Sequence, residues 1–478
     1  MFSTLKGHTD SINAVRFLPD QDIEGDVIIS GSVDQSLRIW HSKRGSRLFA
    51  ASSIVEGVHK GSVNAIATCS GYPSIFASAS ADGIVAIFSV LYLEARIQVS
   101  LLQKIHTTPK FYPLSLALSV LPSSPPSALP GLILAVAGSS PSISVYVSPS
   151  PSSSFSSQAT LSGHENWIRS LSFTSEDQAD PESDLILASA SQDKYIRLWR
   201  IHRGEGMPPA AAGGDTKTFG LTSRLSNKAH KLRIGERDIW SITFEALLMG
   251  HEDWIYTAAW RPRTAAEPGI RLLSASADNS ISIWAPEESS GIWLTTSRLG
   301  EISNYKGAST ATGSAGGLWM GLWSPDGNSV VALGKSGSWR HWKRNTGEDR
   351  WVQSVGIGGH VKAVTGCSWG KAGGYLLSTG LDQTTRLHSK WVKKPDGGDG
   401  SWHEFSRPQI HGYDVNCIAN LGGSSFVSGS DEKLLRVFDE PRSIAGVLEK
   451  LCGIYEKSKV RFSPFPHSYR PPDCYSAN

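Results

Sequence analysis

The stretch Gly250-His251-Glu252-Asp253-Trp254-Ile255, followed by Ser274-Ala275-Ser276-Ala277-Asp278 and by Trp284, decides the fold of this chain. The same order of a Gly-His pair, an apolar strand, the pattern Ser-x-Ser-x-Asp and a tryptophan six residues later occurs twice more. These copies run from Gly7-His8 to Asp34 and Trp40, and from Gly163-His164 to Asp193 and Trp199. A signature that returns with a period of roughly 40 residues is typical of a propeller blade, a sheet of four antiparallel strands. The sequence therefore predicts an all-β fold built from blades.

An apolar position four residues after the histidine extends this pattern to weaker copies. It is occupied by a β-branched residue in six repeats: Ile12, Val63, Ile168, Ile255, Val364 and Val415. Such a residue at the edge of an alternating apolar pattern indicates a buried strand. Together with two degraded copies, the chain holds eight candidate repeats, which open near His8, His59, His106, His164, His251, Ser314, His360 and His411. We predict a WD40 β-propeller with one seven-bladed ring and the start of a second; the alternative is a single ring of eight repeats.

The repeats predict the domain organisation. Residues 1–400 are expected to form the first propeller, with inserted loops at 122–130, 149–157 and 204–237, all exposed. Phe2–Lys6 is expected to pair into the last blade of the ring. Residues 401–454 are expected to form the first repeat of an incomplete second propeller, with a short amphipathic helix over Ser443–Ile454. Residues 455–478 are expected to be a disordered tail.

Composition excludes several classes of protein. The net charge of +3 on 478 residues gives no global field that would demand a nucleic acid or another acidic partner. The five cysteines form no Cys-x-x-Cys pair, which argues against a zinc site or a disulfide framework and indicates a reducing compartment. We expect no signal peptide, no membrane span and no cofactor. The expected location is the cytoplasm, with the nucleus as a second compartment.

Serine, histidine and aspartate occur together in each good repeat, so an acyl-transfer triad has to be considered. A triad needs one exposed nucleophile, whereas here the same trio returns three times with a tryptophan attached. We therefore interpret these residues as structural networks that tie the strands of a blade together and catalyse nothing. They are His8, Asp34, Trp40, His164, Asp193, Trp199, His251, Asp278 and Trp284.

Two further groups of residues are candidates for contact with partners. Trp167 and Trp254 directly precede predicted strands at one rim, where they either anchor a protein partner or pack beneath their own loops. A basic run in the 204–237 insertion either contacts RNA phosphate or is simply solvated: Arg224, Lys228, Lys231, Arg233 and Arg237.

Several segments are more particular than the general repeat pattern. They are Leu161–Trp199, Leu247–Tyr256, Ser274–Trp284, Arg407–Asp414, Val427–Asp439 and Leu451–Ile454. In these segments the chain resembles the family of the WD-repeat second subunit of the Elongator complex, and the likeness covers most of residues 1–454. The family has two consecutive seven-bladed propellers, whereas this chain stops after the first repeat of the second ring, so we expect a truncated member or a fragment.

The resemblance implies a non-catalytic scaffold in a complex that modifies the wobble uridine of transfer RNA. The implied partners are the large scaffold subunit and the catalytic, acetyltransferase-like subunit, with indirect or weak transfer RNA contact. A rival function is direct RNA binding through the basic insertion. A third is hydrolysis by one Ser-His-Asp set.

Overall fold

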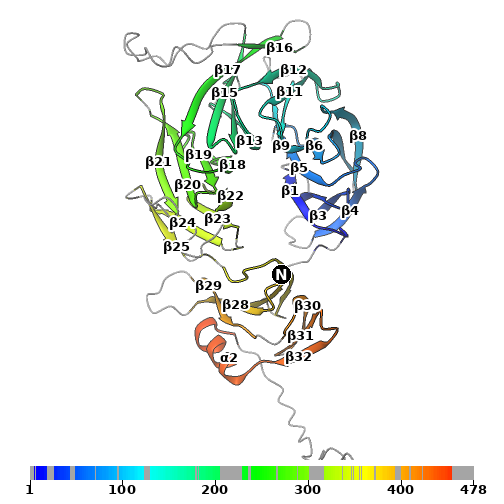
Figure 1. The fold of residues 1–478 in the computed structure, drawn as a ribbon, viewed down its shortest axis with the longest axis vertical. Helices are drawn as coiled ribbons and strands as arrows, with labels where there is room; N and C mark the ends of the chain where they lie inside the picture. The colour runs from blue at the N-terminus through cyan, green and yellow to red at the C-terminus, as the bar shows by residue number, and fades with distance from the viewer. Residues whose placement is uncertain are drawn as a thin grey trace, which may run out of the picture. The chain divides into compact units, whose positions relative to one another are not determined.

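The fold is taken from a computed structural model (Figure 1). It divides into two compact units, Met1–Val361 and Lys362–Asn478, which are described separately. The structure describes residues 5–454 except 6, 19–25, 43–48, 70, 94–95, 123–129, 178–179, 181, 205–228, 235–237, 265–266, 288, 301–316, 336, 338, 346, 348, 355, 357, 371–372, 393–399, 409–410 and 423.

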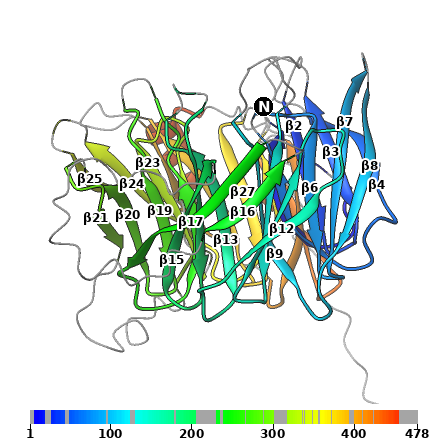
Figure 2. The same ribbon diagram turned by 90° about the horizontal axis from the view of Figure 1, so that it is seen from above.

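The described residues of the first unit form six antiparallel sheets, here called blades 1 to 6 (Figures 1 and 2). Blade 1 holds β1 (Ile12–Leu18), β2 (Val27–Ser32), β3 (Leu37–Ser42) and β4 (Phe49–Val55), and blade 2 holds β5 (Val63–Thr68), β6 (Ile75–Ser80), β7 (Ile84–Leu93) and β8 (Arg96–His106). Blade 3 holds β9 (Pro113–Val120), β10 (Leu132–Gly138), β11 (Ile143–Ser148) and β12 (Ser156–Leu161). Blade 4 holds β13 (Ile168–Ser175), β14 (Leu185–Ser191), β15 (Tyr195–Arg203), β16 (His230–Ile234) and β17 (Asp238–Met249). Blade 5 holds β18 (Ile255–Trp260), β19 (Leu272–Ser276), β20 (Ser280–Pro286) and β21 (Trp293–Gly300), and blade 6 holds β22 (Leu318–Trp323), β23 (Ser329–Gly334), β24 (Trp339–Asn345) and β25 (Arg350–Ser354).

The apolar cores of this unit lie between neighbouring blades rather than within one sheet. Blades 1 and 2 share a core that includes Ile29 and the stacked rings of Phe76 and Phe88, whose centroids are 4.8 Å apart. Similar cores join each following pair of blades. The first strands of successive blades also lie beside one another, from β1 and β5 through to β18 and β22. A blade that buries its faces only against its neighbours is the packing of a propeller, so the predicted all-β WD40 propeller fold is confirmed.

The two end blades of this unit leave apolar residues uncovered. In β1, Ile12, Val15 and Phe17 are 49%, 46% and 62% exposed, whereas the corresponding faces of blades 2 to 5 are covered by neighbours. In β22, Met320 and Leu322 are exposed as well. A seventh blade that closes the ring would cover these side chains; the number of blades in the ring stays a prediction.

The second unit holds two sheets and a short helical segment. Blade 7 comprises β26 (Val364–Trp369), β27 (Tyr375–Gly380), β28 (Thr385–Trp391) and β29 (Ser401–Ser406), and blade 8 comprises β30 (Val415–Gly422), β31 (Ser425–Ser430) and β32 (Leu435–Asp439). The predicted amphipathic helix corresponds to α2 (Arg442–Val447) and the π-helix η2 (Leu448–Cys452), which ends at Gly453 with a φ of 70°. Leu448 and Cys452 pack into a core with Tyr375, Leu377 and Leu387 of blade 7.

The structure corrects several predicted boundaries. Ser401–Ser406 pairs with β28, so the boundary predicted at residue 400 falls inside blade 7. The loop predicted at 149–157 ends earlier, because Ser156 and Ser157 pair with β11. The insertion predicted at 204–237 contains β16, which alternates exposed and buried residues and buries Leu232, so this part is not a loop. His106 ends the outer strand of blade 2 and does not open blade 3. The predicted loop 122–130 (except 122 and 130), Phe2–Lys6 (except Leu5) and the tail at 455–478 lie outside the described residues.

One irregularity is shared by all eight blades. The first strand pairs out of register at its second residue, so that this residue has no partner across the ladder. A bulge of this kind re-aims one side chain away from the pleat. We call these positions the bulge residues: Asn13, Asn64, Leu114, Arg169, Tyr256 and Trp319 in the first unit, and Thr365 and Asn416 in the second.

Candidate functional site

The residues of the repeat signature meet inside their blades. In blade 1, Nδ1 of His8 lies 2.9 Å from Oδ2 of Asp34, and Nε2 lies 2.8 Å from Oγ of Ser30. The indole N–H of Trp40 donates to the same Ser30 oxygen at 2.8 Å. The two ring nitrogens of His8 are thus both used, Nδ1 toward the carboxylate and Nε2 toward the serine hydroxyl. We call such a group of four residues a polar set.

Blades 4 and 5 repeat this geometry. His164 lies 2.7 Å from Asp193 and 2.9 Å from Ser189, to which Trp199 donates at 3.1 Å. In blade 5, His251 lies 2.9 Å from Asp278 and 2.7 Å from Ser274, to which Trp284 donates at 2.8 Å. The side chains of the three histidines are at most 2% exposed.

The hydrogen bonds within the polar sets lower the pKa of the aspartates. Burial alone would raise the pKa of Asp278, but the hydrogen bond from His251 and the backbone N–H of Glu252 hold it well below its usual value. Burial would likewise raise the pKa of Asp193, but the hydrogen bond from His164 outweighs burial and lowers it. At Asp34 the bonds from Ser36 and from the backbone N–H of Thr9 lower the pKa against burial. Each aspartate is therefore ionised in the folded chain at neutral pH.

Blades 2 and 8 carry incomplete versions of the polar set. His59 lies 2.6 Å from Ser78, while Asp82 is 3.8 Å from its Nδ1. Burial lowers the pKa of His59 more than Asp82 raises it. In blade 8, His411 Nδ1 lies 2.5 Å from Glu432, which stands where blades 1, 2, 4 and 5 have aspartate, and its Nε2 lies 2.8 Å from Ser428.

The burial of the polar sets bears on the hydrolase hypothesis. Ser30, Ser189 and Ser274 are buried, and each accepts a hydrogen bond from an indole. A serine nucleophile has to reach a substrate, and a buried hydroxyl that is held between an imidazole and an indole cannot do so. The geometry of these three trios therefore supports the structural interpretation. Among the residues that the structure describes, no cluster of histidine, cysteine and carboxylate side chains is arranged to hold a metal ion.

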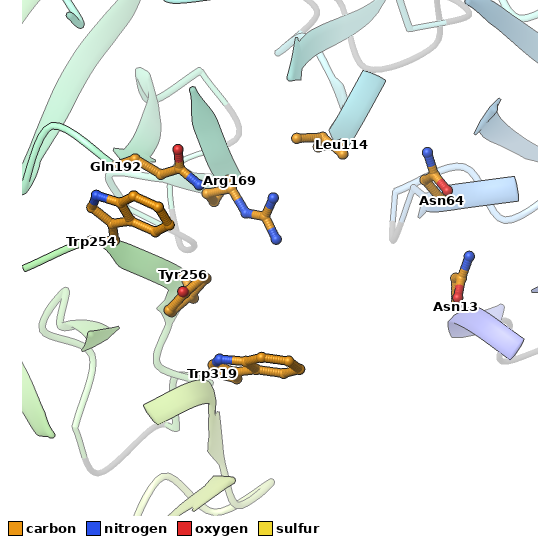
Figure 3. A pocket seen from close by; sticks show the side chains of 8 residues that line it. All are labelled: Asn13, Asn64, Leu114, Arg169, Gln192, Trp254, Tyr256 and Trp319. Atoms are coloured by element: carbon orange, nitrogen blue, oxygen red, sulfur yellow. The ribbon is translucent and has the colours of Figure 1, made fainter. Parts of the chain in front are cut away.

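A pocket of about 420 Å³ lies at the bulge residues of the first unit. It is lined by Asn13, Asn64, Leu114, Arg169, Gln192, Trp254, Tyr256 and Trp319. Figure 3 shows Arg169, Tyr256 and Trp319 on one side of the space, with Asn13 and Asn64 across from them. All six bulge residues of this unit thus line one pocket, which collects one side chain from each of six blades.

The rim of this pocket is built by a repeated backbone contact. In each of blades 1 to 6, the first residue of the hairpin between the second and third strands donates its N–H to the carbonyl just before the first strand, as Gln192 does to Trp167 at 2.9 Å. Ala277 makes the same contact with Trp254 at 2.8 Å. Trp167 and Trp254 are 44% and 43% exposed, so neither is covered by its own loop, and Trp254 lines the pocket.

The basic run is only partly described. Lys231 and Arg233 lie on the exposed face of β16, alternating with the buried Leu232 and Ile234. Arg224, Lys228 and Arg237 lie outside the described residues. The two described cations lie on an outer strand of blade 4, and neither lines the pocket.

Sequence reasoning missed most of the pocket. It identified Trp254 but not Arg169, Tyr256 or Trp319, because the repeat pattern marks the β-branched position four residues after the histidine. The bulge residue follows that position directly, and it varies in type from blade to blade. The signal that could have identified the pocket was this variable position, directly after a position that is nearly always β-branched.

Comparison with known proteins agrees with the fold and with the resemblance. The family described as WD domain, G-beta repeat matches residues 1–41, 155–200, 241–285 and 352–389. Elongator complex protein 2 of Saccharomyces cerevisiae is 40% identical over 96% of this chain and 56% of its own length. The proteins of the same name from Schizosaccharomyces pombe and Homo sapiens are 37% and 31% identical over 94% and 95% of this chain, and 54% and 52% of their own lengths. The chain therefore spans about half the length of these relatives.

No helix in the described residues has the length and apolar character that a membrane crossing requires.

Proposed function

Because this chain is a WD-repeat protein homologous to Elongator complex protein 2, we propose that it is a non-catalytic scaffold subunit of the Elongator complex. Its partners in this proposal are the large scaffold subunit and the catalytic, acetyltransferase-like subunit. By holding the catalytic subunit it supports modification of the wobble uridine of transfer RNA. The cytoplasm, with the nucleus as a second compartment, is the location that accompanies this role.

The burial of the polar sets is the observation that carries the proposal. The residues that could form a catalytic triad instead hydrogen-bond to one another inside the blades, as His251, Ser274 and Asp278 do. The exposed side chains that could bind a partner include Trp167 and Trp254, which directly precede the first strands of blades 4 and 5. Tryptophan at a surface of this kind is enriched among residues that dominate protein interfaces. A protein arranged in this way acts by presenting surfaces.

Co-purification tests the proposal. This chain is co-expressed with the large scaffold subunit and the catalytic subunit of its own organism and captured by a tag. The proposal expects both subunits in the eluate, and expects Trp167→Ala with Trp254→Ala to reduce their recovery. Trp339→Ala, which changes another exposed tryptophan, is the matched control and should leave recovery unchanged. A folded chain that recovers neither subunit would contradict the proposal.

Direct RNA binding is the rival function, and the exposed pair on β16 gives it a defined test. Deleting 204–237 would remove β16 and its buried Leu232, so charge substitution is the cleaner change. Lys231→Glu with Arg233→Glu keeps the strand and removes two cations. If these cations bind phosphate, transfer RNA affinity falls and the dependence of affinity on salt becomes shallower. An unchanged affinity and salt dependence would remove the rival for these two residues.

A further inference from the structure

The pocket at the bulge residues has two chemically different walls. Arg169, Tyr256 and Trp319 come from the first strands of blades 4, 5 and 6, and form a cation and two rings in succession. The guanidinium of Arg169 lies 5.6 Å from the ring centroid of Tyr256, and that ring lies 6.1 Å from the ring of Trp319. The opposite wall carries the amides of Asn13 and Asn64 (Figure 3).

The guanidinium of Arg169 lies over the ring of Tyr256 but is not neutralised. Within the described part of the chain it makes no hydrogen bond or ion pair, and it contacts the ring of Tyr256. Other arginines of this unit behave differently: Arg200, for example, is held by Glu176 and Glu245. A guanidinium that lies over a ring without an ion pair can still donate two of its N–H groups to one carboxylate.

The amides on the pocket wall match a peptide backbone. The side chains of Asn13 and Gln192 make no hydrogen bond among the described residues, and Asn64 uses only its oxygen, which accepts from Ser62 at 2.9 Å. Each free amide group can donate or accept. An extended peptide presents alternating N–H and C=O groups that such side chains can pair.

Size and charge favour a peptide over a nucleic acid. A pocket of about 420 Å³ is large enough for a few side chains. Arg169 is the one cation among the lining residues, whereas binding of a nucleic-acid backbone needs several. Asp253, which directly precedes Trp254, and Asp10, three residues before Asn13, would also repel a row of phosphates.

We propose that this pocket binds an extended peptide in which one carboxylate side chain pairs with Arg169 and a neighbouring aromatic side chain packs on Tyr256 and Trp319. The asymmetry of the ring supplies the specificity, because blades 4 to 6 recognise the side chains and blades 1 and 2 recognise the backbone. This inference is independent of which complex the chain joins.

Fluorescence polarisation with the whole chain tests the inference. The probes are labelled ten-residue peptides in which glutamate stands beside phenylalanine in a Gly-Ser background, with the two residues in either order or one residue apart. Matched peptides carry glutamine for glutamate or alanine for phenylalanine. Binding is expected for at least one glutamate-phenylalanine peptide, and each matched change should weaken it by roughly tenfold or more.

Variants of the chain assign the contact. Arg169→Gln should weaken the glutamate peptide by roughly tenfold or more and leave the glutamine peptide unchanged. Trp319→Ala should weaken the phenylalanine peptides alone. Arg169→Glu should reverse the preference, so that a peptide with lysine in place of glutamate binds better. Arg350→Gln and Trp339→Ala, at exposed positions outside the pocket, are the controls and should change nothing.

Three outcomes would overturn the inference. They are no binding by any of the peptides, binding that Arg169→Gln leaves unchanged, and binding of a labelled single-stranded oligonucleotide in place of the peptides. Thermal melting of each variant shows that a loss of binding is not a loss of folding.

Discussion

Nδ1 of His251 lies 2.9 Å from Oδ2 of Asp278, although the two residues are 27 positions apart in the sequence. The histidine precedes the first strand of blade 5 and the aspartate stands in the hairpin between its second and third strands. Their contact therefore holds the segment before β18 against the hairpin between β19 and β20. Both side chains are almost fully buried, so water could not replace the hydrogen bond if either residue were removed.

The first prediction concerns this pair. His251→Ala and Asp278→Ala should each lower the free energy of unfolding by about 1–3 kcal/mol, because a buried polar group loses its hydrogen bond. The double variant should cost less than the sum of the two, with a coupling of about 0.5–3 kcal/mol. Urea denaturation measures all three, with the exposed Glu252→Gln as control. Strictly additive effects would contradict the pairing.

The second prediction concerns acid. The pKa of Asp278 is depressed in the folded chain, and that of an unfolded aspartate is about 3.9. Its contribution to stability is therefore complete above about pH 5 and is lost as the pH falls through and below the unfolded value. Between pH 5 and pH 2 the unfolding free energy of the native chain should fall more steeply than that of Asp278→Asn. Parallel curves in urea denaturation at a series of pH values would contradict this.

The third prediction separates two neighbouring acids of blade 8. Glu432 contacts both His411 and Arg436, whereas Asp431 contacts Asn416. Glu432→Gln should lower the unfolding free energy of the second unit by more than Asp431→Asn does, because the buried His411 would face a neutral amide in place of the carboxylate. Asp431→Asn should cost less than about 0.5 kcal/mol. Denaturation followed by hydrogen exchange in β30 and β31 reports on this unit, and the opposite ranking would contradict the assignment.

The fourth prediction tests the seven-bladed ring. Phe17 and Leu91 are exposed to a similar extent, 62% and 54%. If a seventh blade closes the ring over β1, Phe17→Asp should destabilise the chain by about 2 kcal/mol or more, because it buries a charge. Leu91→Asp, on the longer third strand of blade 2, should stay within about 0.5 kcal/mol. Equal, small effects in urea denaturation would contradict closure over β1.

Much of the fold could be predicted from the sequence, because the polar sets impose a fixed order on the chain. Where His251, Asp278 and Trp284 all appear, the strands between them follow. Where the set is degraded, the start of the blade is mispredicted. His106 was predicted to open blade 3, but it belongs to the outer strand β8, and β9 begins at Pro113. The strand β16 was missed because it pairs with the neighbouring β17 and no part of the repeat signature marks it.

The pocket was harder to predict than the blades. Arg169, Tyr256 and Trp319 are far apart in sequence, and only the arrangement of blades brings them together. Their side chains point into the pocket because a bulge re-aims each one, and bulges leave little trace in an alternating apolar pattern. Trp254 was predicted at a rim because it directly precedes a strand that the repeat marks, and in the structure it lines the pocket.

Footprinting of histidines with diethyl pyrocarbonate tests most directly whether the polar sets are internal supports. The reagent acylates accessible imidazoles, and mass spectrometry assigns each modified position. In the folded chain, the exposed His106 should be modified readily, while His8, His164 and His251 should be protected until urea unfolds the protein. Modification of these three histidines in the folded chain at the rate of His106 would show that they lie open to water, and would contradict the account.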